Sequence, residues 1–285
     1  MYTTIISTSE LAKHIDQPDW ALIDCRFTLA EPERGRGDYL QAHIPGAVYA
    51  HLNEHLSAPV VPGVTGRHPL PDAETVAERF STWGIDSDAQ VVAYDDAGGA
   101  YAARLWWMLR WLGHEAAAVL DGGWPAWTGA GLPVRGGAET RLRRNFSANP
   151  RFGLLADSTE VELCRSDAQW KVLDSRTAER YRGENETIDP IAGHIPGAVS
   201  APYPDNLDPT AHFRSKEELH RRFEDLFGAV PASQAIFYCG SGVTAAHNIL
   251  AAVHAGFEMP RLYVGSWSEW IIDPQRPVAV GEDTD

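Results

Sequence analysis

The chain alternates short apolar runs with longer segments of helical character. The short runs are rich in Val, Ile, Leu and aromatic residues, which favour β-strands, and polar segments separate them from the helical stretches. Because crossover helices join parallel strands and cover both faces of their sheet, the pattern predicts an α/β fold with mainly parallel sheets flanked by helices. The expected strands include 22–24, 91–94, 117–120 and 235–238, and the expected helices include 73–82, 101–111 and 245–253.

The same series of elements occurs twice. The segment His-Ile-Pro-Gly-Ala-Val lies at 43–48 and again at 194–199, and in each copy a strand ending in Asp-x-Arg lies upstream. A repeat this long indicates a duplicated domain and not a solenoid, whose units are much shorter. We therefore expect a first domain over 1–137, a linker over 138–154 and a second domain over 155–285.

The segment after the expected strand 235–238 has the properties of a reactive cysteine site. It reads Cys-Gly-Ser-Gly-Val-Thr over 239–244 and precedes a helix. Its glycines let the backbone bend so that successive N–H groups point to one side, and the helix N-terminus adds positive partial charge. These groups favour a thiolate, the nucleophilic form of cysteine. Cys25 and Cys164 lack such glycines, so we interpret both as structural.

The first copy differs at the position that matters most for this chemistry. Asp95 stands where the second copy has Cys239, and the segment Asp-Ala-Gly-Gly follows it. An aspartate cannot accept a sulfur atom, and its charge would repel an anionic substrate. We expect one catalytic copy and one inactive copy.

Composition narrows the range of partners. The net charge of −15 argues against nucleic acid or an anionic membrane as a partner. No apolar stretch approaches the ~18–20 residues of a membrane helix. The 3 cysteines form no C-x-x-C pair, and the spacing of the 11 histidines predicts no metal site. A cytoplasmic protein without metal or cofactor is expected.

Taken in order and in duplicate, these segments resemble the tandem-domain rhodaneses, a family of thiosulfate and 3-mercaptopyruvate sulfurtransferases. The resemblance rests on the repeated His-Ile-Pro-Gly-Ala segments, the Asp-x-Arg strand ends, the Cys239 loop and Gly-Ser-Trp-x-x-Trp over 265–270. It implies two rhodanese-like domains, the first inactive. It also implies that Cys239 takes sulfur from a small-molecule donor as a persulfide and passes it to a thiol, thioredoxin or cyanide.

The resemblance also assigns further site residues. Arg180 matches the substrate arginine of the family, and Arg182 is a nearby candidate that matches no motif position. The loop is expected to hold the transferred sulfur through its backbone N–H groups. Its residues after the cysteine are Gly240, Ser241, Gly242, Val243 and Thr244.

Two signals for the sulfur donor disagree. The neutral pair Gly240-Ser241 resembles the mercaptopyruvate type, whereas the thiosulfate type carries basic side chains there. The mercaptopyruvate type also has a second arginine at the position of Asp189, so this residue resembles the thiosulfate type. We favour 3-mercaptopyruvate, with thiosulfate as the alternative.

A proton relay associated with the mercaptopyruvate type is matched only in part. Ser241 matches its serine and His68 its histidine, but Asn53 occupies the acidic position. A cysteine phosphatase needs Cys-x5-Arg, and the arginine position here is Ala245. A non-catalytic persulfide carrier or sensor stays open as an alternative. The intact Cys239 loop favours turnover, but it does not exclude a partner protein as the destination of the sulfur.

Overall fold

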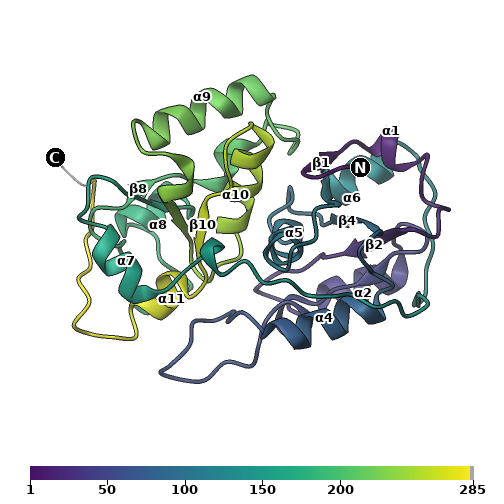
Figure 1. Cartoon of the computed structure of the whole chain (residues 1–285), viewed down its shortest axis with the longest axis horizontal. Helices are drawn as coiled ribbons and strands as arrows, with labels where there is room; N and C mark the ends of the chain where they lie inside the picture. Colours follow the sequence, from purple (N-terminus) through teal and green to yellow (C-terminus); the bar gives the residue numbers. More distant parts are fainter. Residues whose placement is uncertain (283–285) are drawn as a thin grey trace. The chain divides into compact units, whose positions relative to one another are not determined.

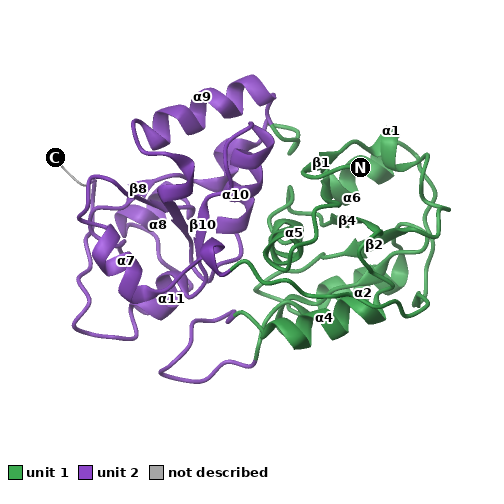
Figure 2. Cartoon of the chain, in the orientation of Figure 1, with its two compact units in different colours: residues 1–58, 70–151, 209–213 green, residues 59–69, 152–208, 214–285 purple. Residues whose placement is uncertain are grey.

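A computed structural model describes residues 1–282 (Figure 1). The chain divides into two compact units (Figure 2). Unit 1 comprises 1–58, 70–151 and 209–213, and unit 2 comprises 59–69, 152–208 and 214–285. Within residues 1–282, no helix combines the length and the apolar character needed to cross a membrane.

Unit 1 contains a five-stranded parallel sheet in the order β1-β5-β4-β2-β3. The central strands β2 and β4 are buried along their whole length, as expected for a sheet covered on both faces. The strands are β1 (Ile5–Ile6), β2 (Trp20–Asp24), β3 (Val48–Tyr49), β4 (Gln90–Tyr94) and β5 (Ala117–Leu120). The helices are α1 (Thr8–Leu11), α2 (Arg34–Gln41), α3 (Leu52–His55), α4 (Ala73–Thr82), α5 (Ala102–Trp111) and α6 (Gly123–Gly129).

Unit 2 repeats this topology, with a five-stranded parallel sheet in the order β6-β10-β9-β7-β8. The predicted α/β fold with two parallel sheets is therefore confirmed. The strands are β6 (Leu155–Ala156), β7 (Lys171–Asp174), β8 (Val199–Ser200), β9 (Ala235–Tyr238) and β10 (Arg261–Tyr263). The α-helices are α7 (Ser158–Cys164), α8 (Ala178–Arg182), α9 (Lys216–Phe227), α10 (Ala245–His254) and α11 (Ser266–Trp270), and short 3₁₀ turns lie at Phe152–Leu154, Tyr203–Asn206 and Ala232–Gln234.

The repeated sequence motifs form the same buried framework in both units. In unit 1 the guanidinium of Arg26 pairs with Asp24 at 2.7 Å, and in unit 2 Arg176 pairs with Asp174 at 2.5 Å. The two motif histidines also have matching contacts, since His43 Nδ1 lies 2.7 Å from the Tyr39 carbonyl oxygen and His194 Nδ1 lies 2.8 Å from that of Tyr181. Both histidines are fully buried, which supports a structural role.

One segment of the first half of the chain belongs to unit 2. The sequence placed all of 1–137 in one domain, but 59–69 has the colour of unit 2 in Figure 2. The reason lies in its polar contacts: the Arg67 backbone N–H donates to Ser268 Oγ at 3.1 Å, and the Arg67 side chain pairs with Asp189. Gly66 makes this approach possible, because a Cβ there would lie 2.6 Å from the Gly265 carbonyl oxygen.

Candidate active site

The Cys239 loop follows β9 and leads directly into α10. Strand β9 is the middle strand of the unit 2 sheet, so the loop begins at the carboxyl end of a buried parallel strand, where α/β folds place their ligands. Gly242 bends the loop with φ +75°, and a Cβ there would lie 2.4 Å from the Val264 carbonyl oxygen. A side chain at this position would therefore be strained in both conformation and space.

The loop stabilises the thiolate of Cys239 even though the residue is only 2% exposed. Burial raises the pKa of the thiol, but hydrogen bonds from the Thr244 hydroxyl and from the backbone N–H groups of Ser241 and Ala245 outweigh it, so the net pKa is lowered. Ala245 is the first residue of α10, so its N–H also carries the positive end of that helix. This arrangement favours the nucleophilic form, as the loop sequence predicts.

The segment 265–268 forms hydrogen bonds with the backbone of Cys239. Ser266 Oγ accepts the Cys239 backbone N–H at 3.1 Å and donates to the Tyr263 carbonyl at 2.9 Å. Ser266 has φ +55°, an uncommon conformation for a residue with a side chain. The Trp267 N–H then donates to the Cys239 carbonyl at 3.0 Å. The Gly-Ser-Trp-x-x-Trp motif thus holds the nucleophile in position.

His68 and Ser241 form a buried pair beside the cysteine. His68 Nδ1 lies 2.7 Å from Ser241 Oγ, and the two residues are 5% and 6% exposed. Ser241 also donates its backbone N–H to the Cys239 sulfur, so the pair is coupled to the nucleophile. Such a pair can hold or move a proton near a reacting sulfur. Asn53, the third residue of the expected relay, belongs to unit 1.

Charged side chains of alternating sign lie next to the loop. Arg180 pairs with Glu186 at 2.9 Å and with Asp189 at 2.9 Å, and Asp189 also pairs with Arg67. The two carboxylates are buried, with side chains 2% exposed. Because a buried charge is costly unless it is paired, these contacts hold the guanidinium groups in place.

The expected substrate arginine faces the loop. A Cβ on Gly240 would lie 3.5 Å from the Arg180 guanidinium, whereas Arg182 pairs with two exposed carboxylates, Glu184 at 2.8 Å and Glu282 at 3.4 Å. A substrate role for Arg182 stays a prediction. The remaining loop residues Val243 and Thr244 complete the turn into α10, with Val243 buried.

Sequence reasoning missed Arg67 and Glu186. Arg67 directly precedes His68, so its place in a segment already assigned to the site was the only available signal. Glu186 lies in no motif of the sequence, and its buried pairing with Arg180 and Arg176 is a tertiary feature.

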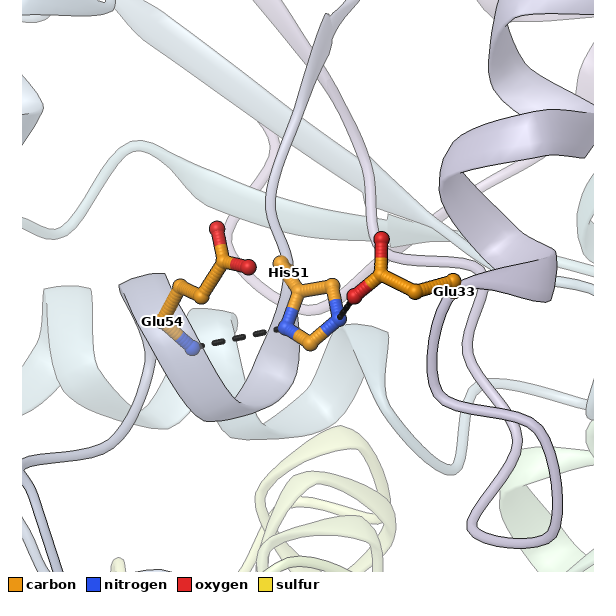
Figure 3. Close-up of side chains that lie close together, drawn as sticks. All are labelled: Glu33, His51 and Glu54. Atoms are coloured by element: carbon orange, nitrogen blue, oxygen red, sulfur yellow. Dashed lines mark hydrogen bonds and ion pairs between the residues drawn. The ribbon is translucent and has the colours of Figure 1, made fainter.

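One group of side chains has the composition of a metal site. Glu33, His51 and Glu54 of unit 1 place ligand atoms within 4.8 Å of one another (Figure 3). However, His51 Nδ1 accepts the backbone N–H groups of Asn53 and Glu54 at the start of α3, so its proton lies on Nε2, which faces Glu33 Oε1 at 3.4 Å. Arg36 also binds both glutamates, at 3.0 and 2.6 Å. These contacts fit a helix cap with an ion-pair network better than a metal centre.

Comparisons with known proteins agree with the fold and with the duplication. The rhodanese-like domain family matches residues 7–130 and 158–273. The chain is 47% identical to a Pseudomonas aeruginosa protein named "Probable 3-mercaptopyruvate sulfurtransferase", over 98% of both chains. It is 31% identical to the thiosulfate sulfurtransferase of Mus musculus, over 99% of this chain and 97% of the relative.

Solved structures give the same result. The crystal structure of a 3-mercaptopyruvate sulfotransferase from Escherichia coli superposes with a TM-score of 0.80 at 32% identity, over 94% of this chain and all (100%) of that chain. A 3-mercaptopyruvate sulfurtransferase from Leishmania major gives a TM-score of 0.84 at 32% identity, over 94% of this chain and 74% of that chain. With two matched domains and full-length relatives, this chain belongs to the rhodanese family and is a sulfurtransferase.

Proposed function

We propose that this protein is a 3-mercaptopyruvate sulfurtransferase that works through a persulfide on Cys239. The observation that carries the proposal is the buried thiol whose pKa is lowered by the Thr244 hydroxyl and by loop N–H groups, despite the opposing effect of burial. The neutral Gly240 and Ser241 beside it favour a donor with a single carboxylate over the thiosulfate dianion.

In the first half-reaction the Cys239 thiolate attacks the thiol sulfur of the donor. A sulfur–sulfur bond forms, the donor carbon–sulfur bond breaks, and its electron pair passes to carbon as the enolate of pyruvate. The enolate takes up the proton that the donor thiol gives up, so one anionic persulfide and one pyruvate result. The His68–Ser241 pair is the proposed carrier of that proton, and its support is the 2.7 Å distance between His68 Nδ1 and Ser241 Oγ.

In the second half-reaction a thiol acceptor attacks the outer sulfur and restores the Cys239 thiolate. The loop N–H groups that stabilise the thiolate are placed to stabilise the persulfide anion as well. A small thiol or a thioredoxin-type protein is the proposed acceptor, and a cytoplasmic location fits three cysteines that are all unpaired. Splitting the transfer through a covalent enzyme predicts ping-pong kinetics.

The test is kcat/KM for 3-mercaptopyruvate and for thiosulfate with one common thiol acceptor, together with the intact mass after donor alone. We expect a large preference for the keto acid and a mass gain of one sulfur atom, located on Cys239 by peptide mapping. A preference for thiosulfate would identify that compound as the main donor. Loading with sulfur but no transfer to any small thiol would favour a persulfide carrier that serves a partner protein.

A further inference from the structure

Four polar residues of unit 2 form a fully buried network beside α10. They are Ser175, Asn206, His247 and Asn248, and none of them is part of the Cys239 loop. Asn206 Nδ2 donates to Asn248 Oδ1 at 2.7 Å and lies 3.1 Å from His247 Nδ1. Because buried polar groups are costly unless they are paired, these contacts fix the position of the side chains that make them.

Asn248 joins α10 to the sheet of unit 2. Its Nδ2 donates to Ser175 Oγ at 2.8 Å and to the Ala201 carbonyl at 2.7 Å. Both amide protons are therefore used, and the nitrogen is the amide atom that faces Ala201, because a backbone carbonyl can only accept. Ser175 directly follows β7 and Ala201 directly follows β8, so one side chain binds the helix to the ends of two strands.

Ser175 extends this link to the nucleophile. Its backbone N–H donates to the Tyr238 carbonyl at 2.8 Å, and Tyr238 directly precedes Cys239. At the other end, Ala245 begins α10, and its N–H donates to the Cys239 sulfur. These contacts close a ring that runs from the nucleophile to the end of β9, through Ser175 and Asn248, and back along the first turn of α10 to the sulfur.

Unit 1 lacks this link. Cys25 is the equivalent of Ser175, because the two are the middle residues of the repeated Asp-x-Arg motif. Leu105 is the equivalent of Asn248, because each is the fourth residue of its helix, α5 or α10. Leu105 is fully buried and has no polar side-chain atom, so it forms no side-chain hydrogen bond to the sheet.

The residue that fills each loop gives a reason for the difference. In unit 1 the Asp95 carboxyl group ties the strand end to the start of α5, since it accepts the N–H groups of Tyr101 and Ala102 at 2.8 Å. In the proposed reaction the Cys239 sulfur gains and loses a sulfur atom, so it cannot serve as a permanent tie. The link through Asn248 joins the same two elements at a distance from the reacting atom.

We propose that Asn248 is a positioning residue of this sulfurtransferase: through Ser175 it fixes the start of α10 against the end of β9, so that the first helix N–H stays directed at the Cys239 sulfur. This inference rests on the proposed function and deepens it by adding a residue that acts through α10. Without the link, the start of α10 is free to move away from the sulfur, and the thiolate loses part of its stabilisation.

Alkylation of Cys239 by iodoacetamide tests the proposal without sulfur transfer, because the thiolate is the reacting form. Ser175→Ala removes the hydroxyl that accepts from Asn248, and Asn248→Leu introduces leucine, as in unit 1. In each variant the pH profile of the rate should move to higher pH. The rate at neutral pH should fall roughly two- to tenfold, and the rate at high pH should stay unchanged.

Two features of the chain keep this measurement specific. Peptide mapping separates alkylation of Cys239 from that of the other two cysteines, Cys25 and Cys164, which are also buried. The charged groups that interact with the Cys239 sulfur, Asp174 and Arg67, are present in every variant, so a change in the profile does not come from a lost charge.

A double variant and a matched control separate positioning from packing. Because Ser175→Ala and Asn248→Leu break one link, the double variant should be affected no more than the more affected single variant. Asn206→Leu removes an equally buried amide but leaves the contact between Asn248 and Ser175, so it should keep the wild-type profile even where its Tm falls. Wild-type profiles in both single variants, or an equal shift in Asn206→Leu, would overturn the proposal.

Sulfur loading distinguishes this inference from the proposed function. In the variants the acidic limb of the kcat/KM profile should move together with the alkylation profile. If the alkylation profiles shift as expected but the wild-type protein takes no sulfur from 3-mercaptopyruvate or thiosulfate, the positioning role of Asn248 is supported and the proposed function is refuted.

Discussion

The loops around Asp95 and Cys239 have the same position in the two units but opposite consequences. Each follows the middle strand of its sheet and leads toward a buried helix, α5 in unit 1 and α10 in unit 2. In unit 1 the Asp95 carboxylate is fully buried and fills the loop itself. It accepts backbone N–H groups at 2.8–2.9 Å from Ala97, Gly99, Tyr101 and Ala102.

The difference shows that one type of loop can serve either structure or chemistry. Burial raises the pKa of Asp95 above its usual range, and the backbone N–H groups oppose that effect only in part. The donors of this loop are therefore taken up by the side chain of Asp95 itself. In unit 2 the same kind of donors lower the pKa of Cys239, and the anion they favour can attack a substrate. A loop whose donors are already satisfied by its own side chain has none left for a transferred sulfur.

The residues around the two loops also differ in charge. Tyr39 and Tyr181 are equivalent, since each donates its hydroxyl to a backbone carbonyl, at 3.0 Å and 2.7 Å. The residue before this tyrosine is Asp38 in unit 1 and Arg180 in unit 2. Unit 1 therefore has an acid at the position where unit 2 has a cation beside Cys239.

The largest expected effect is the loss of the nucleophile. Cys239→Ser should abolish both persulfide formation and turnover, because a serine hydroxyl is not ionised at neutral pH and cannot form a persulfide. Adding Asp95→Cys to that variant tests whether a cysteine in the loop of unit 1 can replace Cys239. We expect no recovery, since unit 1 has Asp38 in place of the substrate arginine. Mass spectrometry after incubation with donor measures both, and sulfur on residue 95 with turnover would show that the loop alone suffices.

The buried Asp-Arg pairs should be equivalent in the two units. Arg26→Ala leaves Asp24 as an unpaired buried carboxylate in unit 1, and Arg176→Ala does the same to Asp174 in unit 2. Each change should destabilise its own unit by about 3–5 kcal/mol. Hydrogen exchange read by mass spectrometry resolves the units, and Arg34→Ala, at a half-exposed ion pair, is the control. Unchanged protection of β2 and β4 in Arg26→Ala would show that the pair is dispensable.

Removing Arg180 should make unit 2 resemble unit 1 in charge without removing its nucleophile. Arg180→Ala should lower kcat/KM for the donor by about tenfold or more, as expected for losing a charge-assisted contact. The reaction of Cys239 with neutral iodoacetamide should change less, because that reagent carries no carboxylate. Arg180→Lys keeps the charge and gives a folded reference. Donor kinetics equal to wild type in Arg180→Ala would remove this assignment.

The smallest effect is expected from the hydroxyl that donates to the thiolate. Thr244→Val removes a hydrogen bond that lowers the pKa of Cys239, so the pKa should rise and the thiolate fraction at neutral pH should fall. The acidic limb of the kcat/KM profile should then move to higher pH, with roughly a two- to tenfold lower rate at neutral pH. The rate at high pH, where the thiol is ionised in both proteins, is the internal control. A profile that does not move would mean that the backbone N–H groups alone stabilise the thiolate.

Much of the fold could be predicted from sequence because its signals are local. The expected helix 73–82 and the strands 117–120 and 235–238 agree with α4, β5 and β9 at both ends. Apolar runs, glycines and turn residues act over a few positions, so their pattern is visible without a structure. The order of the parallel strands needed the structure, because sequence indicates that strands exist and not which of them pair.

The candidate site also has a part that is visible in the sequence and a part that only the structure shows. The sequence alone determined the duplication and predicts a reactive Cys239 loop with an inactive counterpart at Asp95, since each is a short contiguous motif. Only the tertiary structure decided that Arg67 reaches Asp189, 122 positions along the chain, and that His68 reaches Ser241, 173 positions away. The physical reason is that each charged side chain has many possible partners, because the chain has 24 basic and 39 acidic residues. No periodic pattern in the sequence indicates which of these partners it contacts. That choice is made by folding, which brings buried donors and acceptors together because leaving them unpaired is costly.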